Sequence, residues 1–575
     1  MQTSEPAGAL TSRPQPDADP DATVLPNSRL APDWWRDAVI YQVYPRSFAD
    51  GNGDGMGDLA GLRDRLPYVA GLGVDAIWIN PWYPSPMADA GYDVSDYRDV
   101  EPIFGTLADA EAVIAEAHKL GLRVLLDIVP NHTSSAHPWF RAALAAGPGS
   151  PERHRYIFRT GRGDGSEPPN DWASVFGGPA WTRVTEPDGR AGEWYLHLFD
   201  VEQPDLNWAE PAVHAEFASI LRFWFDRGVD GFRIDVANSL FKHPDLPDLA
   251  GRDVRSFAEP GSEEHPFWDR DVVHEVYREW RAVADSYPEP RVFVAEAWVS
   301  SPERLARYVR PGQLHSAFNF DFLLAPWRAP LLREVIDQSL RALEAVDAEP
   351  TWVLSNHDVV RQVTRLGRPQ PTSLVARPEP PDGALVVDLE LGTRRARAAA
   401  LLMLALPGGA YVYQGEELGL WEVEDLPHAL LQDPTWERSG HTERGRDGCR
   451  VPIPWSGDRP PFGFGPPGAK PWLPQPSAWA SLTAEAQSGR ADSMLELYRT
   501  ALRIRREHPG LGSGVLTWRG GPDGALAFDR SDGFVCVVNV DAQPFALPPH
   551  DAVLAASGPL EDGLVPADTA VWLQI

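Results

Sequence analysis

The feature of this sequence that most constrains its fold is the alternation of eight short strand-like segments with longer helical stretches. Each strand-like segment is rich in β-branched or aromatic residues, and the stretches between them repeat apolar residues at helical spacing, as in residues 213–225. Eight strands that alternate with helices predict an α/β fold, a (β/α)8 TIM barrel with a parallel sheet. The candidate strands are residues 38–48, 75–79, 123–129, 231–235, 292–298, 316–322, 352–358 and 410–414.

The regular alternation is broken in two places, and each break predicts a further domain. After the third candidate strand, about 70 residues rich in Gly, Pro and Trp replace the expected helix, and a structureless loop of that length is improbable in a compact domain. We therefore predict an inserted subdomain B at 131–204, in a barrel formed by 33–130 and 205–508. Short alternating runs predict a C-terminal antiparallel β domain at 509–575, and residues 1–32, rich in Pro, Asp and Ser, are predicted to be a flexible leader.

Charge and cysteine content exclude several classes of function. A formal net charge of −30 argues against binding to nucleic acid or to anionic membranes, whereas a small neutral molecule is not repelled. The two cysteines, Cys449 and Cys536, do not have the spacing of a disulfide framework or a zinc site. The chain shows neither a signal-peptide pattern nor an apolar stretch of membrane-spanning length, so we expect a cytoplasmic protein that is a monomer or a weak homo-oligomer.

Ionisable residues, together with one asparagine, gather at the carboxyl ends of four candidate strands. In a (β/α)8 barrel these ends form one face, at which active sites lie. A scaffold gains no stability from charges collected there, so the cluster predicts an active site. Its members are Asn131 and His132 after the third strand, Arg233 and Asp235 on the fourth, Glu296 on the fifth, and His357 and Asp358 on the seventh.

Two of these carboxyl groups have opposed surroundings. Arg233 and Asp235 are two residues apart and share one face of their strand, where the guanidinium keeps the carboxylate ionised, as a nucleophile requires. Glu296 has apolar neighbours, which favour its protonated form, as a general acid requires. Such a pair predicts glycoside hydrolysis, with retention of configuration if the carboxyl groups lie about 5–5.5 Å apart. Taken singly, the first motif could equally be a buried ion pair and Glu296 an incidental carboxylate; their coincidence with the His357–Asp358 pair favours an active site.

Residues 50–58, DGNGDGMGD, have the spacing of the first half of a calcium-binding loop. Oxygen ligands recur at every second position among glycines, but Gly61 stands where such a loop carries a bidentate Glu. We expect one structural Ca²⁺ or Mg²⁺ here and no organic cofactor; the alternative is a polar, Gly-rich turn. The expected ligands are Asp50, Asn52, Asp54, the carbonyl of Met56, and Asp58.

Several longer motifs follow one another along the chain. They are AVIYQVYPRSFADGNGDGMGDLAG, DIVPNHTS, QPDLNW, GFRIDVAN, AEAW, SNHD, YQGEELG and GRDGCRVPIPW. On these motifs the chain, from about Asp33 to its C-terminus, resembles the α-amylase superfamily (glycoside hydrolase family 13) and within it the oligo-1,6-glucosidase/α-glucosidase branch. The resemblance implies a barrel enzyme that acts on α-glucosides through a covalent glucosyl-enzyme.

The resemblance also implies roles for individual residues. Asp235 is expected to be the nucleophile, Glu296 the acid/base, and Asp358 a third carboxylate that binds sugar hydroxyls and stabilises the transition state. Asp93 and Arg446 are expected to hold the terminal glucose and to block longer chains, which makes the enzyme exo-acting. Further expected substrate contacts are Tyr92, as an aromatic platform, and His132, Arg233, His357 and Arg361.

These expectations predict a retaining, exo-acting α-glucosidase that releases α-glucose from the non-reducing end of short α-glucosides, with or without transglucosylation. Its expected substrates are maltose, malto- or isomalto-oligosaccharides, or sucrose. Val236, the residue after Asp235, is reminiscent of α-1,6-active members, whereas GRDGCRVPIPW resembles α-1,4-active ones. Specificity for α-1,4 links, or mixed specificity, is therefore predicted.

Three alternatives stand beside this prediction. The chain could be an oligo-1,6-glucosidase, or a trehalose synthase or sucrose-acting glucosyltransferase on the same scaffold. It could also be a non-catalytic relative, such as the ectodomains of amino-acid transporter heavy chains. The last alternative predicts a lost catalytic triad and a membrane anchor, and it is disfavoured because Asp235, Glu296 and Asp358 are all present.

Overall fold

The computed structural model describes residues 32–254, 265–374, 386–540, 543–560 and 562–575. The leader predicted at the N-terminus lies outside the described residues, apart from its last position.

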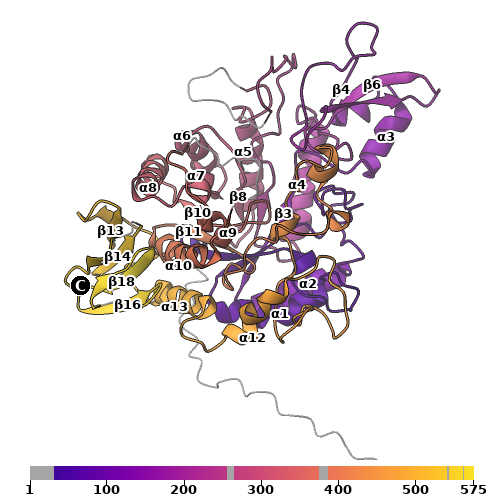
Figure 1. Ribbon diagram of the computed structural model, residues 1–575. Helices are drawn as coiled ribbons and strands as arrows, with labels where there is room; N and C mark the ends of the chain where they lie inside the picture. The colour runs from indigo at the N-terminus through magenta and orange to yellow at the C-terminus, as the bar shows by residue number, and fades with distance from the viewer. Residues whose placement is uncertain (1–31, 255–264, 375–385, 541–542, 561) are drawn as a thin grey trace, which may run out of the picture.

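Eight parallel strands close into a barrel, which confirms the predicted (β/α)8 fold (Figure 1). Around the barrel the strands follow the order β10-β11-β1-β2-β3-β7-β8-β9. The two ends of the sheet meet at a parallel bridge between Phe318 and Thr351, where the amide of Asn319 donates to the carbonyl of Thr351 (3.0 Å). The strands are β1 (Val39–Val43), β2 (Ala76–Ile79), β3 (Arg123–Ile128), β7 (Gly231–Ile234), β8 (Val292–Ala295), β9 (Ser316–Ala317), β10 (Thr351–Val353) and β11 (Gly409–Tyr413).

Helices cover the outside of the barrel. The strands are therefore buried along almost their whole length, as is typical of parallel strands covered on both faces. The larger helices are α1 (Leu59–Leu72), α2 (Leu107–Lys119), α4 (Pro211–Phe225), α5 (Val273–Asp285), α8 (Ala329–Glu344), α10 (Leu389–Ala405) and α13 (Met494–Glu507). The shorter helices are α3 (Pro138–Ala146), α6 (Pro302–Ala306), α7 (Phe320–Leu324), α9 (Gln362–Gly367), α11 (Pro434–Arg438) and α12 (Ala484–Gln487).

The sixth strand is shorter than the sequence predicts. Strand β9 ends at Ala317, and the second half of the predicted strand 316–322 belongs to helix α7. The side chain of Asn319 caps this helix by accepting a hydrogen bond from the amide of Phe322 (2.9 Å). A short apolar run suits a strand and a buried helix equally, so the sequence pattern alone could not separate them.

The long segment after β3 forms a small sheet of its own above the barrel (Figure 1). Its antiparallel strands, in the order β4-β6-β5, are β4 (Phe158–Arg159), β5 (Trp181–Thr185) and β6 (Ala191–Leu196). Trp172, Trp181 and Leu196 belong to a separate hydrophobic cluster in this region. An antiparallel bridge between His132 and Asp205 brings the two ends of the segment together at the barrel.

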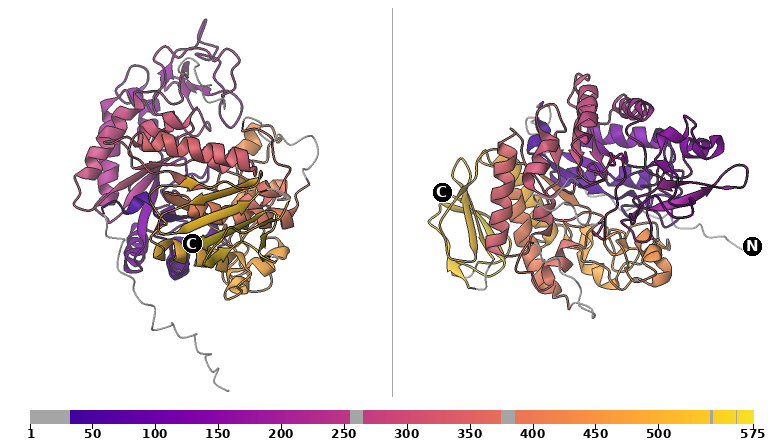
Figure 2. Two further views of the ribbon diagram at one scale, coloured as in Figure 1. Left: turned by 90° about the vertical axis from the view of Figure 1, so that its left-hand side faces the viewer. Right: turned by 90° about the horizontal axis from the view of Figure 1, so that it is seen from above.

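The C-terminal segment forms an antiparallel sheet on the other side of the barrel from this segment (Figures 1 and 2). The sheet is joined to the barrel where the indole of Trp572 donates to the carbonyl of Leu401 on α10 (3.0 Å). The predicted antiparallel β structure of this segment is confirmed, and the first two residues of strand β16 are exposed. The strands are β12 (Thr517–Trp518), β13 (Ala525–Asp529), β14 (Phe534–Asn539), β16 (Ala552–Ala556) and β18 (Thr569–Gln574), with β15 (Phe545–Ala546) and β17 (Leu564–Val565) as a separate pair.

Within the described parts of the chain, every helix is too short or too polar to cross a bilayer.

Candidate active site

A cavity of about 440 Å³ lies at the carboxyl ends of the barrel strands. Seven of the ten residues predicted to bind or transform substrate line it, and they come from loops far apart in the sequence. These seven are Tyr92, His132, Asp235, Glu296, His357, Asp358 and Arg446. The structure therefore brings most of the predicted cluster together around one cavity at this face of the barrel.

Arg233 lies beneath the cavity and connects three carboxyl groups. Its Nη1 donates to Asp235 Oδ1 (2.7 Å) and to Asp127 Oδ1 (2.8 Å), and its Nη2 pairs with Glu296 Oε2 (2.7 Å). Arg233 and Asp127 are direct neighbours on the paired strands β7 and β3, which explains why their side chains meet. Asp235 and Glu296 are thus held on adjacent nitrogens of one guanidinium.

The carboxyl groups of Asp127, Asp235 and Glu296 all pair with a single positive charge, the guanidinium of Arg233. Burial raises the pKa of Asp127 to about 6, although Arg233 acts in the opposite direction. Burial also raises the pKa of Asp235, with Arg233 opposing it and Glu296 and Asp127 adding to it. One guanidinium cannot neutralise three carboxylates, so the group retains a proton at higher pH than isolated carboxyls do.

The structure confirms one sequence-based interpretation of this group and contradicts two others. Arg233 pairs with Asp235 as predicted, and it also pairs with Asp127 and Glu296. The prediction that the guanidinium keeps Asp235 ionised is wrong, because burial raises the pKa of Asp235 in spite of Arg233. The predicted apolar surroundings of Glu296 are also wrong, because its Oε2 accepts from the amide of Val236 (3.0 Å) in addition to Arg233. Burial in the folded chain and partners from neighbouring strands cannot be read from local sequence.

The turn after β7 places both catalytic candidates. Val236 has φ of 45°, a left-handed conformation that a β-branched residue rarely adopts. In this conformation its amide points to Glu296 Oε2, while Asp235, one residue earlier, lines the cavity. Backbone strain of this kind is typical of functional sites.

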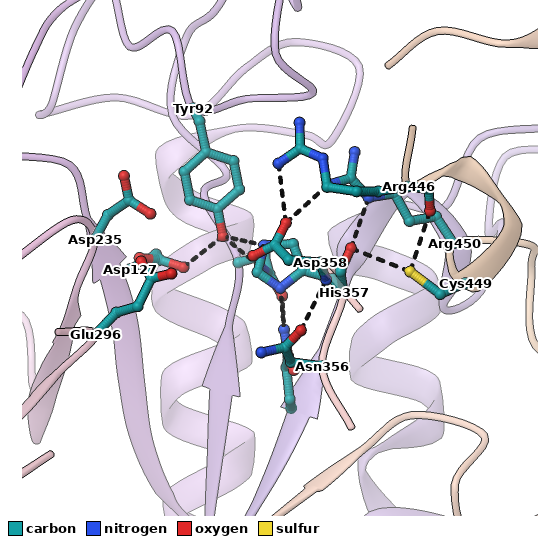
Figure 3. Close-up of polar contacts among 12 residues, drawn as sticks. Tyr92, Asp127, Asp235, Glu296, Asn356, His357, Asp358, Arg446, Cys449 and Arg450 are labelled. Atoms are coloured by element: carbon teal, nitrogen blue, oxygen red, sulfur yellow. Dashed lines mark hydrogen bonds and ion pairs between the residues drawn. The ribbon is translucent and has the colours of Figure 1, made fainter. Parts of the chain in front are cut away.

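Asp358 lies across the cavity and is surrounded by cations (Figure 3). Its Oδ1 accepts from Arg446 Nη1 and from Arg450 Nη2, both at 3.0 Å. Burial acts to raise the pKa of Asp358, but the charges around it prevail and hold that pKa well below its usual value. The neighbouring His357 is buried, which lowers the pKa of its imidazole, so the two arginines supply the positive charge.

Arg446 pairs with Asp89 and not with the predicted Asp93. Arg446 Nη2 lies 2.7 Å from Asp89 Oδ1, and both residues line the cavity. The side chain of Asp93 is buried away from the cavity and accepts from the amides of Ala88 and Asp89 (3.0 Å each). Positive φ angles at residues 90 and 91 turn the loop, so that the side chain three residues before Tyr92, and not the one after it, faces the cavity.

Arg361 is also placed differently from its prediction as a sugar contact. It is buried, with Nη1 donating to the carbonyl of Gln414 (3.0 Å) and Nη2 donating to the carbonyl of Cys449 (2.8 Å). It does not line the cavity. Arg361 therefore braces the loop that carries Arg446 and Arg450.

Tyr92 and His357 form a stacked pair between the two charged groups (Figure 3). Their rings are nearly parallel, with centroids 5.4 Å apart. The Tyr92 hydroxyl lies 2.7 Å from His357 Nε2 and donates to Asp127 Oδ2 (2.8 Å). Both rings are thereby fixed at the cavity, where a flat aromatic surface can support a pyranose ring.

Comparison with known proteins identifies the family. Residues 42–514 match the family model of the α-amylase catalytic domain. The chain belongs to the α-amylase family.

Relatives of this α-amylase family member cover almost its whole length. A probable α-glucosidase of Rhizobium meliloti (strain 1021) is 40% identical over 525 residues, which are 88% of this chain and 89% of the relative. An oligo-1,6-glucosidase of Parageobacillus thermoglucosidasius is 35% identical over 506 residues, 83% of this chain and 84% of the relative. The crystal structure of an α-glucosyl transfer enzyme superposes with a TM-score of 0.79 at 37% identity, covering 94% of this chain and 99% of that one.

This α-amylase family member also contains a buried cation that the sequence analysis missed. Lys242 Nζ lies 2.6 Å from Asp205 Oδ2 and donates to Asn131 Oδ1 (2.8 Å) and to the carbonyl of Ser239 (2.6 Å). Asn131 in turn donates to His132 Nδ1 (3.2 Å), which leaves the other ring nitrogen of His132 directed to the carbonyl of Tyr92 (3.2 Å). Burial lowers the pKa of His132 to about 4, so the imidazole is neutral at physiological pH.

The expected metal ligands lie together in one tight loop. Asp50 accepts from the amides of Gly53 and Gly55, and Asp58 accepts from the amide of Gly61 (2.7 Å) at the start of α1. A Cβ on Gly55 would lie 2.0 Å from the carbonyl oxygen of Lys470, so the loop packs closely against residues 462–472. In the described residues, three or more His, Cys, Asp or Glu side chains are nowhere grouped as metal ligands. The oxygen donors suit a hard cation, and metal binding stays a prediction.

Asp127, Asp89 and Arg450 are the main site residues that the sequence analysis overlooked. A signal for Asp127 was present, because a carboxylate within a buried strand requires a charged partner. Arg450 lies in the same GRDGCR motif as Arg446, but nothing in that motif shows that both reach Asp358.

Proposed function

We propose that this chain is a retaining, exo-acting α-glucosidase that releases α-glucose from the non-reducing end of short α-glucosides with α-1,4 or mixed linkage. The observation that carries this proposal is the attachment of Asp235 and Glu296 to adjacent nitrogens of Arg233 beside a sugar-sized cavity. Two carboxyls held so close together support the retaining mechanism, which uses a spacing of about 5–5.5 Å.

The proposed reaction has two displacement steps. In the first, a carboxylate oxygen of Asp235 attacks the anomeric carbon while the glycosidic bond breaks and Glu296 gives its proton to the leaving oxygen. In the second, Glu296 takes a proton from water as the water oxygen attacks the anomeric carbon and the bond to Asp235 breaks. Two inversions restore the α configuration.

The other carboxylates support the positive charge that develops on the sugar ring. Asp358 is held ionised by Arg446 and Arg450 and can accept hydrogen bonds from sugar hydroxyls. Neutral His132 and His357 can donate or accept at hydroxyl groups without adding charge. The pair of Asp89 and Arg446 is the proposed contact for the terminal glucose, in place of Asp93.

The test is to follow by NMR, before mutarotation, the anomer of glucose released from an aryl α-glucoside, whose leaving group contributes no glucose of its own. The proposal expects α-glucose as the first product, and glucose release from maltose or isomaltose. Initial β-glucose from the aryl glucoside, or no glucose from any short α-glucoside, would refute it.

A second candidate function is glucosyl transfer. It is favoured by the similarity to the α-glucosyl transfer enzyme, which shares the fold over nearly the whole chain. Hydrolysis and transfer can be separated by analysing the products formed from maltose, isomaltose, sucrose and trehalose. A larger yield of new glucosides than of free glucose from dilute substrate favours transfer, and sucrose rearranged without glucose release favours an isomerase.

We also propose that the loop at residues 50–58 holds one structural Ca²⁺ or Mg²⁺ through Asp50, Asn52, Asp54, Met56 and Asp58. The cation would neutralise the carboxylates of the loop and take no part in the reaction. Treatment with EDTA is expected to lower Tm, and added Ca²⁺ to restore it; an unchanged Tm in calorimetry would contradict metal binding. A cytoplasmic location and a monomeric or weakly associated state stay predictions, to be checked by fractionation and by sedimentation.

A further inference from the structure

We propose that Arg438, which does not line the cavity, is a positioning residue that holds the contacts for the terminal glucose in place. Arg438 is the last residue of α11, and none of the sequence motifs includes it. The inference rests on the proposed function, because the contacts in question are those of Asp89 and Arg446.

Two walls of the cavity come from segments that are far apart in the sequence. The insertion wall belongs to the segment between β3 and α4 and consists of Val175, Phe176 and Phe199. The loop wall belongs to the segment that follows β11 and consists of Thr435, Glu443, Gly445 and Arg446. Both walls extend beyond the ends of the barrel strands, so their spacing depends on contacts between the two segments.

Arg438 connects the two walls. Its Nε donates to the carbonyl of Gly177 (2.9 Å), which is 261 residues away in the sequence, and its Nη2 donates to the carbonyl of Pro179 (3.1 Å). Gly177 directly follows Phe176 of the insertion wall, and α11 carries Thr435 of the loop wall. The side chain of Arg438 is only 16% exposed, so water competes little for these hydrogen bonds.

The turn that accepts these hydrogen bonds lies close to the backbone of α11. Gly177 and Gly178 have φ angles of 106° and 72°, in the left-handed region that favours glycine. A Cβ on Gly177 would lie 3.1 Å from the carbonyl oxygen of Arg438, and a Cβ on Gly178 would lie 3.6 Å from its Nη2. The turn therefore leaves little room for any side chain between the insertion and α11.

The other end of α11 is attached to Arg446. Asp433 caps the helix by accepting from the amide of Thr435 (2.9 Å), and it pairs with Arg446 Nε. Arg446 Cζ also lies 5.1 Å from the centroid of the Phe176 ring, on the insertion wall. Because α11 has only five residues, a displacement of its end at Arg438 is transmitted to Asp433 and from there to Arg446.

A chain of contacts leads from Arg438 to the second member of the glucose-binding pair. Arg438 Nη1 lies 3.9 Å from Asp200 Oδ2. The amide of Asp200 donates to Gln203 Oε1 (2.9 Å), and Gln203 Nε2 donates to Asp89 Oδ2 (3.2 Å). Asp89 pairs with Arg446, so the contacts form a closed ring through both walls. Arg438 thus supports Asp89 from one direction and Arg446 from the other.

A comparison of KM with kcat separates positioning from a merely structural role. Contacts to the terminal glucose act on the bound substrate and on the transition state alike, so their misplacement raises KM and changes kcat by no more than about twofold. Arg438→Met removes two hydrogen bonds between the walls, and we expect KM for maltose to rise about fivefold. The Ki of 1-deoxynojirimycin, an imino analogue of glucose that fills the terminal glucose site alone, is expected to rise by the same factor.

A double-mutant cycle tests whether Arg438 acts through Arg446. In the wild-type background we expect Arg438→Met to lower kcat/KM for maltose about fivefold; in the Arg446→Met background the same change should have an effect of less than about twofold, because the contact that it positions is already lost. Arg438→Lys keeps the charge but not the fork of donors, so its KM should lie between those of the wild type and Arg438→Met.

Arg328→Met is the matched control. The Arg328 guanidinium also donates to two backbone carbonyls, those of Pro371 (2.7 Å) and Gln370 (3.2 Å), and it does not line the cavity. The substitution should leave KM for maltose and the Ki of 1-deoxynojirimycin unchanged, even if Tm falls.

Three results would overturn the inference. They are an unchanged KM and Ki in Arg438→Met, a loss confined to kcat, and an equal effect of Arg438→Met with and without Arg446. If Arg438→Met shows no cooperative thermal unfolding, the same comparisons are made with Arg438→Lys. Failure of the proposed function is distinguishable, because the wild-type chain would then release no glucose from maltose.

Discussion

The two sides of the cavity carry the same number of carboxyl groups but different numbers of arginines. On one side, Asp127, Asp235 and Glu296 share Arg233. On the other side, Asp89, Asp358 and Asp433 share Arg446 and Arg450. Figure 3 shows Asp127, Asp235 and Glu296 on one side of Tyr92, and Asp358, Arg446 and Arg450 on the other.

The balance of charge decides how each side can act. Burial raises the pKa of Asp127 to about 6 despite Arg233. Burial also acts on Asp433, but Arg446 and Arg450 prevail and lower its pKa to about 2. The side with one arginine can therefore bind and release a proton near neutral pH, whereas the side with two arginines keeps its charges fixed. The first suits proton transfer, and the second suits recognition of sugar hydroxyls.

The largest expected effect comes from removing Asp235, the proposed nucleophile, on the side of the cavity with one arginine. Asp235→Asn keeps the size of the side chain but cannot form the glucosyl-enzyme, so we expect kcat/KM to fall by about four orders of magnitude or more. The measurement is glucose release from maltose, with thermal unfolding as the control for folding. Turnover close to wild type would contradict the proposal that the carboxyl groups around Arg233 carry out the reaction.

A smaller loss is expected from the side with fixed charges. Arg446→Met removes the arginine that pairs with Asp89 and leaves Asp358 and Asp433 with Arg450, and we expect kcat/KM to fall by about 10²-fold or more. Arg361→Met is the contrasting variant, because Arg361 braces the loop without lining the cavity. It should lower Tm while KM changes little. If Arg361→Met altered KM as strongly as Arg446→Met, the distinction between contact and brace would fail.

The next prediction tests which acidic side chain, Asp89 or Asp93, belongs to the side of the cavity on which the charges stay fixed. Asp89→Asn weakens the ion pair with Arg446 at the cavity, and we expect KM for maltose to rise about tenfold, a change of about 1.4 kcal/mol. Asp93→Asn changes a side chain that faces away from the cavity, so its KM should stay within about twofold of wild type. A large rise in KM for Asp93→Asn but not for Asp89→Asn would support the pairing of Asp93 with Arg446 that was predicted from sequence.

The last prediction concerns stability and leaves activity unchanged, and it extends the comparison to a carboxyl group that is hydrogen-bonded to a hydroxyl instead of a guanidinium. Glu416 is buried and accepts from the hydroxyl of Tyr498 (2.7 Å), and burial raises its pKa to about 8. Because this pKa is higher in the folded than in the unfolded state, the stability that depends on its proton is present at acidic pH and is lost as pH rises toward 8.

Glu416→Gln is therefore expected to flatten the fall of Tm between about pH 5 and pH 8, a difference of at most a few kcal/mol in the free energy of unfolding. Scanning calorimetry across this range measures it. An identical pH dependence in the variant would show that Glu416 is not protonated in the folded protein. Activity on maltose at pH 6 serves as the control for an intact site.

Much of the fold and the catalytic centre could be predicted from local patterns. Alternation of strand-like and helical runs predicted the eight strands, and the position of Asp235, Glu296 and Asp358 after three of them predicted a shared site. Both predictions depend on geometry that repeats, since the carboxyl ends of parallel strands always meet at one face of the barrel.

The sequence by itself therefore determined the barrel, the family, and the positions of Asp235, Glu296 and Asp358 at the cavity, because periodic backbone structure converts residue spacing into position. Only the tertiary structure decided that Asp89 replaces Asp93, that Arg361 is a brace, and that Arg233 serves three carboxyls. The direction of a loop side chain depends on individual backbone angles, and the charge of a buried group depends on partners from other strands. Neither quantity is contained in the spacing of neighbouring residues.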